Sequence, residues 1–569
     1  MGPFTIKVYG PPGTGKTRTL QRLVEWLIGV RYEKEEIRAE LLEKGFPEDW
    51  LDENFGRYEL HDIAFATFQT SALMEFVEGR LGMDMDEDRR PKAPLRYFRT
   101  IHGICQALLY DFDVWNPEIS RRMGGKSPER WFQLFANQRR RIDPSFRFDP
   151  EAMGMANPFE KANVLWQTVS QVVNKEYHKV GREGITQKIL EALPPALHEH
   201  YFAWEAFKEE KGIVDYNDML MDGYDYLKSG VIHLPTKVLI VDEFQDLSPL
   251  QFEIFKLLAK DKELVVIAGD DWQTIFTWMG ADPRFLIKYP ADLEIVLRKT
   301  YRLPEKILRE ALSYAKANLR RSVFKDMVST GKKGAFAHIR YFSTRREAHM
   351  DQLAKWVLAE LKKGHSVMIL TRTNSQALHF FGEFYKRGFK PRSLKKSTKW
   401  SKKVEGVGDF FDLLHSIIEF EKGNSSREVL LRVAWASGVD VALDDGEHNM
   451  LPLHAYLVQD WKSKIVLERI QEVWGRQARR FIEKILREGL RPMDGIPEEH
   501  ELYIDTIHAS KGREADVVFL INEMPRRNWR RFFRSEEELE AEARVWFVGM
   551  TRARKALGIV WTDKAFRLS

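Results

Sequence analysis

The sequence of 569 residues predicts an α/β fold with two lobes, each built on a parallel sheet and each carrying a mainly helical insertion. Three observations lead to this prediction. A glycine-rich loop joins a strand-like run to a helix-like run, the strand-like runs fall into two series, and a long helical stretch interrupts each series. Strands that alternate with helices form parallel sheets covered by helices, and two such series imply two lobes.

The first element is a phosphate-binding loop in residues 9–20, YGPPGTGKTRTL. The pattern G-x-x-x-x-G-K-[ST] follows the apolar run 5–9 and precedes the helix-like run 19–27, as a P-loop requires. Lys16 is expected to bind the β- and γ-phosphates of ATP, and the Thr17 hydroxyl to bind Mg²⁺. Kinases, GTPases, transporters and motors share this loop, so it leaves the function open. The expected ATP-binding residues of the loop are Gly10, Pro11, Pro12, Gly13, Thr14, Gly15, Lys16 and Thr17.

The strand-like runs form two groups along the chain. The first group lies at 5–10, 61–68, 237–244, 263–270 and 293–297, and the second at 337–342, 366–373, 516–522 and 556–562. Helical periodicity fills the gaps at about 99–205 and 400–500. We therefore expect one helical insertion in each lobe.

Composition excludes several classes of protein. A hydrophobic content of 44% supports packed cores, no apolar run is long enough to cross a bilayer, and no signal-peptide pattern is present. The single cysteine, Cys105, excludes an internal disulfide and a cysteine-cluster metal site, which fits a reducing cytoplasm. We interpret Cys105 as a small buried residue, and we expect a cytoplasmic protein without a membrane partner.

Basic residues gather in three clusters, although 89 basic and 84 acidic residues nearly balance over the whole chain. Residues 386–403 hold nine Lys or Arg and no acid, residues 525–534 place five arginines among three aromatic residues, and the third cluster spans 137–148. A solvated face is the alternative interpretation of each cluster. Guanidinium groups neutralise phosphates and aromatic rings stack on bases, so we favour nucleic acid as the partner.

Two carboxylates follow the strand-like run 237–241. We expect Asp242 to supply a Mg²⁺ ligand and Glu243 to orient the attacking water. The stretch between Lys16 and Asp242 is too long for one compact lobe, which agrees with a helical insertion.

Nine blocks, found in order along most of the chain, give it a family resemblance. They are ATFQTSALMEF at 66–76, RTIHGIC at 99–105, DYNDML at 215–220, VDEFQD at 241–246, VVIAGDDWQTIFTWMGA at 265–281, KTYR at 299–302, LTRTNSQ at 370–376, DTIHASKGREADVVFLI at 505–521 and EARVWFVGMTRARKAL at 542–557. With these blocks the sequence resembles the UvrD/Rep/PcrA group of superfamily 1 DNA helicases. The resemblance implies an ATP-dependent enzyme that moves 3′ to 5′ on single-stranded DNA and unwinds duplex at single-strand–duplex junctions.

The resemblance also implies a division into four domains. Residues 1–98 and 206–300 would form a first RecA-like lobe (1A), and 99–205 its helical insertion (1B). Residues 301–399 and 500–569 would form a second RecA-like lobe (2A), and 400–499 a reduced helical insertion like domain 2B.

By the same resemblance, ATP lies between the two lobes. Arg18 and Tyr301 match the pair that sandwiches the adenine, and Glu514 matches the residue that binds the ribose. Gln273 is expected to sense the γ-phosphate, while two arginines stabilise charge on the transferring phosphoryl group. The implied catalytic residues are Lys16, Glu243, Gln273, Arg302 and Arg552, and the implied metal ligands are Thr17 and Asp242.

A DNA groove is implied by other positions in the blocks. Phe68, Phe276 and Trp278 match residues on which bases stack, an interaction that needs no particular sequence. The implied DNA-binding residues are Thr67, Phe68, His102, Phe276, Trp278 and His508.

Four features depart from the family pattern. The family's glutamine before the phosphate loop has no counterpart in residues 1–9, so adenine preference is not implied, and Met279 replaces the usual arginine. Residues 31–60 add acidic, helical sequence without an assigned function, and the second insertion is small. A single-strand translocase that strips proteins without robust unwinding is therefore an alternative. So are a non-catalytic DNA-binding scaffold and an enzyme that tracks RNA.

Overall fold

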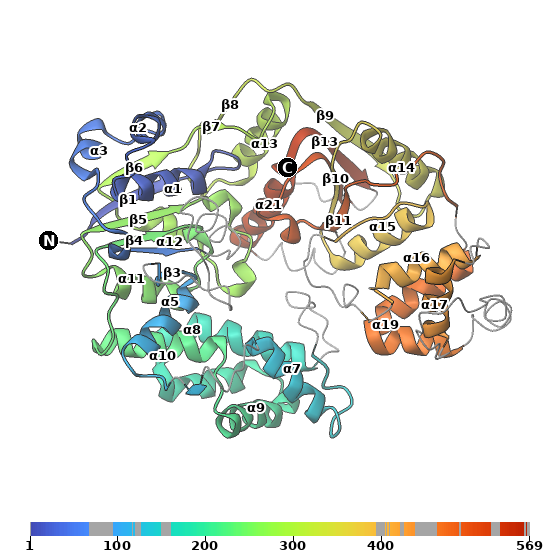
Figure 1. Ribbon diagram of the computed structural model, residues 1–569, viewed down its shortest axis with the longest axis horizontal. Helices are drawn as coiled ribbons and strands as arrows, with labels where there is room; N and C mark the ends of the chain where they lie inside the picture. Colours follow the sequence, from blue (N-terminus) through green and yellow to red (C-terminus); the bar gives the residue numbers. More distant parts are fainter. Residues whose placement is uncertain are drawn as a thin grey trace. The chain divides into compact units, whose positions relative to one another are not determined.

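The computed structural model describes residues 2–67, 95–116, 118–119, 127–148, 161–393, 404, 407–408, 410–421, 426–437, 464–488, 491–524, 535–562 and 565. The chain divides into two compact units (Figure 1). The first comprises Met1–Phe336, Pro525–Ala556 and Arg567–Ser569, and the second comprises Ala337–Met524 and Leu557–Phe566.

A parallel sheet forms the centre of the first unit. Its strands are β1 (Phe4–Tyr9), β2 (Ile63–Ala66), β3 (Phe98–Arg99), β4 (Val238–Val241), β5 (Leu264–Gly269) and β6 (Leu293–Val296). The six strands have the order β3-β2-β4-β5-β1-β6, and every neighbouring pair is parallel. The pairing Tyr9↔Gly269 brings the carboxyl ends of β1 and β5 to one edge, where ligands bind in parallel α/β sheets. The predicted α/β fold with a parallel sheet is confirmed for this unit.

Side chains on the sheet alternate between two hydrophobic cores. Ile6 and Val8 of β1 pack in one core, whereas Tyr9 packs in the other. Val238 and Leu239 of β4 separate in the same way. Since successive side chains of a strand point to opposite faces, both faces of the sheet are covered, and its strands read as continuous apolar runs.

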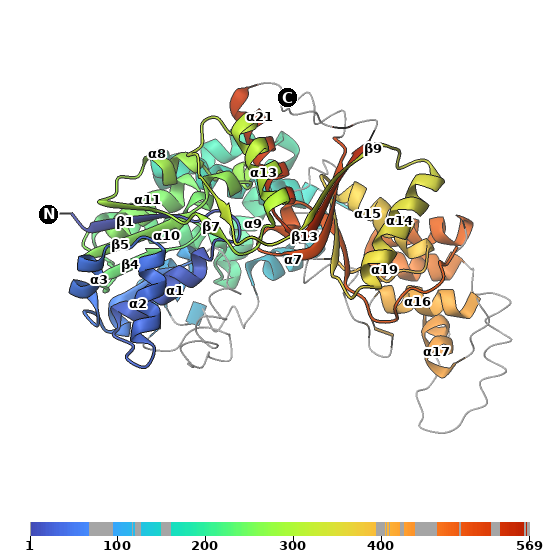
Figure 2. The same ribbon diagram turned by 90° about the horizontal axis from the view of Figure 1, so that it is seen from above.

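Helices cover these two faces. The core of Ile6 and Val8 includes residues of α1 (Lys16–Leu27), α2 (Lys34–Glu43) and α3 (Glu48–Asn54), which lie together in both views (Figures 1 and 2). The other core extends into the predicted helical insertion, which contains α5, α7, α8 and α9. The bounds of the remaining main helices are α5 Ile101–Asp111, α7 Pro128–Arg139, α8 Lys161–Ala192, α9 His198–Lys211, α10 Tyr216–Ser229, α11 Pro249–Ala259, α12 Pro283–Lys288, α13 Glu305–Asn318 and α21 Glu536–Met550.

Short elements complete the first unit. They are the 3-10 helices η1 (Leu60–Asp62), η3 (Pro195–Leu197), η4 (Phe244–Asp246), η5 (Asp271–Gln273) and η6 (Thr277–Met279), and the paired strands β7 (Lys299–Thr300) and β8 (Val328–Ser329). The elements η4, η5 and η6 follow β4 and β5, so they lie beyond the carboxyl ends of these strands.

The second unit has a sheet of its own. Its strands are β9 (Ala335–Phe342), β10 (Val367–Thr371), β11 (Leu502–Thr506), β12 (Ala515–Asn522) and β13 (Ala553–Thr562), in the order β11-β10-β12-β13-β9. Strand β10 lies between β11 and β12 and is parallel to both. The helices of this unit are α14 (Glu347–Leu361), α15 (Asn374–Lys386), α16 (Phe410–Glu421), α17 (Arg427–Ala436), α19 (Lys464–Glu488) and the 3-10 helix η8 (His508–Ser510).

The unit boundaries differ from the predicted lobe boundary at residue 301. Helices α13 and α21 cluster with the first unit, although both fall in the predicted second lobe. The division into domains 1A, 1B, 2A and 2B stays a prediction. No helix in the described part of the chain has the length and apolarity needed to span a membrane.

Candidate nucleotide-binding site

The glycine loop has the backbone geometry of a phosphate-binding loop. Strand β1 ends at Tyr9 and α1 begins at Lys16, with Gly15 in the left-handed region at φ 81°. Gly13 also has a positive φ, and a Cβ atom built on it would lie 2.4 Å from Cβ of Arg302. Both glycines are therefore required by conformation, and Gly13 also by the close approach of Arg302.

Lys16 lies beside the two carboxylates at the end of β4. Its Nζ bonds to Oδ1 of Asp242 and lies 2.8 Å from Oε1 of Glu243. Burial alone would lower the pKa of Lys16, but the charges of the two carboxylates outweigh burial and raise it. Lys16 is therefore a cation at neutral pH, held where the sequence predicts the phosphates.

Thr17 and Asp242 lie close enough to share a metal ion. The Thr17 Oγ1 donates a hydrogen bond to Oδ2 of Asp242 at 2.9 Å. Groups of three or more His, Cys, Asp or Glu that could hold a metal do not occur among the described residues. This donor set fits Mg²⁺, which is usually held by one or two carboxylates together with substrate phosphates.

Glu243 has an unusual backbone conformation. Its φ is 55° and its ψ is 38°, in the left-handed region that residues other than glycine rarely adopt. The Gln245 Nε2 donates to Oε2 of Glu243 at 2.6 Å and so fixes the carboxylate. Strained residues of this kind are concentrated at functional sites, which supports the predicted role of Glu243.

Hydrogen bonds link this carboxylate to an arginine distant in sequence. The Gln245 Oε1 accepts from the backbone N–H of Asp270 at 2.9 Å, and a carboxylate oxygen of Asp270 accepts from Nε2 of Gln273 at 2.8 Å. The Gln273 Oε1 then accepts from Nη2 of Arg552 at 2.9 Å. The series brings together the predicted residues Glu243, Gln273 and Arg552.

Arg302, two residues after the end of β7, lies in the same region. Its Nη1 lies 3.4 Å from the carbonyl oxygen of Thr551, the residue before Arg552. The Thr300 Oγ1 donates to the carbonyl of Pro12 at 2.9 Å, and the Tyr301 N–H donates to that of Gly13 at 2.8 Å. The KTYR block therefore packs directly on the phosphate-binding loop.

Both residues of the predicted adenine pair are exposed to solvent. Arg18 forms an ion pair with Glu40 at 2.5 Å, and 55% of its side chain is exposed. Tyr301 is 40% exposed and accepts a hydrogen bond from Lys44 at 3.2 Å. The predicted ribose residue, Glu514, directly precedes β12 in the second unit.

The predicted DNA-binding residues lie on several elements. Thr67 follows β2 and is buried, while Phe276 and Trp278 lie at η6 and are half-buried. His102 is in α5, its ring packs edge-on against Tyr216, and burial lowers its pKa to about 4. His508 begins η8 in the second unit, and Phe68 lies outside the described residues.

The structure describes one basic cluster fully. Phe146 and Phe148 of the cluster 137–148 are buried in the core, so their rings are not exposed for stacking on bases. Arg139 of this cluster pairs with Glu199 at 2.6 Å. Residues 394–403 and 525–534 of the other two clusters lie outside the described residues.

Several polar residues of the site were missed by sequence reasoning. Gln245 and Asp270 stand inside blocks quoted above, so a residue-by-residue reading of those blocks could have found them. Lys325 is fully buried against Asp270 and Asp271, and no local pattern marks it. Glu40 and Lys44 lie in the segment 31–60, which had no assigned function.

This fold and this site define a P-loop nucleotide-binding protein in which Arg552 is hydrogen-bonded to Gln273. Family models match the chain as the UvrD/REP helicase N-terminal domain over residues 4–294 and as the UvrD-like helicase C-terminal domain over 392–564. The chain belongs to the UvrD/Rep helicase family.

Individual relatives are distant in sequence. ATP-dependent DNA helicase UvrD2 of Mycobacterium bovis is 22% identical over 70% of this chain and 58% of its own length. DNA helicase II of Haemophilus influenzae is 24% identical over 97% of this chain and 81% of its own length. ATP-dependent DNA helicase PcrA of Staphylococcus aureus is 24% identical over 56% of this chain and 54% of its own length. The chain therefore spans little more than half the length of the UvrD2 and PcrA proteins.

Proposed function

We propose that this protein is an ATP-dependent DNA helicase that moves 3′ to 5′ along single-stranded DNA and unwinds duplex at single-strand–duplex junctions. The observation that supports the proposal most is the series of hydrogen bonds from Glu243 through Gln245, Asp270 and Gln273 to Arg552. A nucleotide bound at Lys16 lies at the Glu243 end of this series. Hydrolysis is therefore coupled to Arg552, which is distant from Lys16 in the sequence.

The residues at the phosphate loop divide the chemistry between them. Lys16 exchanges its carboxylate partners for phosphate oxygens, which leaves Glu243 free to orient the attacking water and accept its proton. Thr17 and Asp242 would hold Mg²⁺, which would supply positive charge to neutralise the phosphates. Arg302 and Arg552 stabilise negative charge that develops on the transferring group.

Coupling to DNA follows from the position of the aromatic residues. Gln273 ends η5, and Phe276 and Trp278 lie at η6 only a few residues further on. A change in the partners of Gln273 therefore shifts the segment on which bases stack. Stacking contributes about 1–3 kcal/mol per base whatever the sequence, which suits a motor that must step along any strand.

A strand-separation assay tests the proposal. Duplexes with a 3′ tail, a 5′ tail or no tail are incubated with ATP and Mg²⁺, and the Lys16→Ala variant is the control. We expect only the 3′-tailed duplex to be unwound, and only by the protein that keeps Lys16. Unwinding of the 5′-tailed duplex alone would reject the polarity, and equal activity of the variant would reject the assigned ATP site.

A single-strand translocase is the second candidate. It is favoured by the small second insertion, in which the described residues form the helices α16, α17 and α19. The expected result for a translocase is ATP hydrolysis stimulated by single-stranded DNA without separation of any duplex. A competition between DNA and RNA strands of matched sequence in the hydrolysis assay shows which nucleic acid the protein prefers. We expect DNA to compete better.

A further inference from the structure

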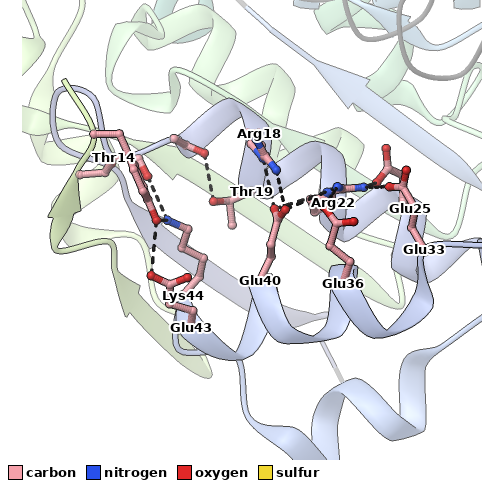
Figure 3. Close-up of polar contacts among 12 residues, drawn as sticks. Thr14, Arg18, Thr19, Arg22, Glu25, Glu33, Glu36, Glu40, Glu43 and Lys44 are labelled. Atoms are coloured by element: carbon pink, nitrogen blue, oxygen red, sulfur yellow. Dashed lines mark hydrogen bonds and ion pairs between the residues drawn. The ribbon is translucent and has the colours of Figure 1, made fainter. Parts of the chain in front are cut away.

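The segment 31–60 packs against the helix that follows the phosphate loop. Arg22 of α1 is 3% exposed, and it contacts Glu33 together with Glu36 and Glu40 of α2 (Figure 3). Ile37 and Leu41 of α2 are fully buried in the core shared with α1. The segment is therefore a fixed part of the first unit, and α2 has a defined face towards the nucleotide site.

Helix α2 holds Arg18, the first of the two side chains that are predicted to enclose the adenine. Glu40 receives two hydrogen bonds from the Arg18 guanidinium, from Nη2 at 2.5 Å and from Nε at 3.2 Å (Figure 3). Burial alone would raise the pKa of the Glu40 carboxyl, but the hydrogen bonds from Arg18 and Arg22 lower it. Glu40 is therefore charged at neutral pH, and it fixes the plane of a guanidinium that would otherwise be mobile.

The residues at the C-terminal end of α2 hold Tyr301, the second of these side chains. Lys44, the residue after α2, lies with Nζ 4.6 Å from the centre of the Tyr301 ring and 3.2 Å from its hydroxyl. The same Nζ donates to the carbonyl oxygen of Thr14 at 3.3 Å (Figure 3). Glu43 adds an ion pair at 2.9 Å with Lys299, two residues before Tyr301.

We propose that α2 is part of the nucleobase-binding site, with Glu40 and Lys44 acting as positioning residues for Arg18 and Tyr301. The inference rests on the proposed function, which places the adenine between these two side chains. A ring and a guanidinium that are already held apart lose less conformational freedom when a base enters between them, so the base binds more tightly.

Equilibrium binding tests this role without turnover. Isothermal titration with the ATP analogue AMP-PNP is compared with titration of inorganic tripolyphosphate, which has no base. Lys44→Ala and Glu40→Gln should weaken AMP-PNP binding about tenfold, the loss expected for one cation–π or charged contact, and leave tripolyphosphate binding within about twofold. Lys44→Arg should restore most of the affinity for AMP-PNP.

Arg38→Ala is the matched control. Arg38 lies on α2 but pairs with Glu48 at 2.6 Å and Asp52 at 3.2 Å, away from the nucleotide site. This variant should bind both ligands like the original protein. Thermal melting of each variant checks that it is folded.

Two outcomes would overturn the inference. One is unchanged or tighter AMP-PNP binding by Lys44→Ala, and the other is an equal loss of AMP-PNP and tripolyphosphate, which would mean that Lys44 only supports the phosphate loop through Thr14. Failure of the proposed function gives a different result. A protein that binds AMP-PNP but hydrolyses no ATP would contradict the proposed helicase activity, and its AMP-PNP affinity would still test the roles of Glu40 and Lys44.

Discussion

Arg552 donates a hydrogen bond from Nη2 to Oε1 of Gln273 at 2.9 Å, although 279 positions separate the two residues in the chain. The amide nitrogen of Gln273 is used at the same time, because it donates to Asp270 at 2.8 Å. The orientation of the amide is thus fixed from both sides. Any ligand that displaces Gln273 also changes the surroundings of Arg552.

Loss of this pair should slow ATP hydrolysis. We expect Arg552→Ala to lower kcat of DNA-stimulated hydrolysis about 10³-fold, as for other arginines that stabilise transferring phosphoryl groups. Gln273→Ala should lower kcat less, and the double variant should be no slower than Arg552→Ala, because the two side chains act as one unit. Arg554→Ala, which removes an exposed arginine of β13 two residues after Arg552, is the control. Additive losses in the double variant would contradict the pairing.

The buried Lys325 should be important for stability. Its side chain is 0% exposed and pairs with Asp270 at 3.1 Å and with Asp271. Lys325→Met leaves two buried carboxylates without their cation, and breaking a buried pair in this way costs about 3–5 kcal/mol. The melting temperature should therefore fall by about 4–6 °C in differential scanning calorimetry, because the unfolding entropy of a unit of this size converts about 0.8 kcal/mol into one degree.

A surface pair provides the comparison for Lys325. Lys188 and Glu191 lie 2.8 Å apart on α8, and both are more than two-fifths exposed. Lys188→Met should change the melting temperature by about 2 °C at most, because water screens the charges of an exposed pair and such pairs contribute little to stability. Equal shifts for the two variants would show that Lys325 has no special role.

Local sequence patterns predicted the parts of the site that are local in the chain. The loop around Lys16 and the pair Asp242 and Glu243 follow strands, and the ends of neighbouring parallel strands meet at one edge of a sheet. Backbone connectivity alone therefore brings these residues together. The strands β1, β4 and β5 could be predicted for the same reason, since buried parallel strands are continuous apolar runs.

Contacts made by tertiary packing could not be predicted in this way. Lys44 contacts Tyr301, which is 257 positions away in the sequence, and Lys325 contacts Asp271, which is 54 positions away. No spacing in the sequence predicts either contact. Phe146 of the basic cluster 137–148 shows the same limit of local sequence patterns. Arginines surround it in the sequence, yet its ring stacks on His200 in the core at 4.1 Å.

His102 should make the stability of the protein depend on pH. Burial lowers its pKa from 6.5 to about 4, so the folded protein holds the ring neutral where the unfolded chain binds a proton. The stability that the neutral ring contributes is complete above pH 6.5 and is lost as the pH falls towards 4. We expect the melting temperature to fall more steeply over this range than in His102→Gln. Parallel curves for the two proteins, measured at constant ionic strength, would contradict the burial of a neutral ring.

Stacking and charge should contribute to DNA binding in separable ways. Trp278→Ala should weaken binding of single-stranded DNA by the roughly 1–3 kcal/mol of one stacked base and leave the slope of log K against log salt unchanged, since no phosphate contact is lost. Reversing the arginines of 525–534, or the basic residues of 386–403, should instead flatten that slope.

Fluorescence anisotropy over a range of salt concentrations measures both effects. Trp356→Ala, which removes a tryptophan that is 37% exposed on α14, is the control for the loss of a surface ring. A flatter slope in Trp278→Ala would show that this tryptophan acts through a neighbouring charge, and an unchanged slope after the charge reversals would remove both clusters from the DNA path.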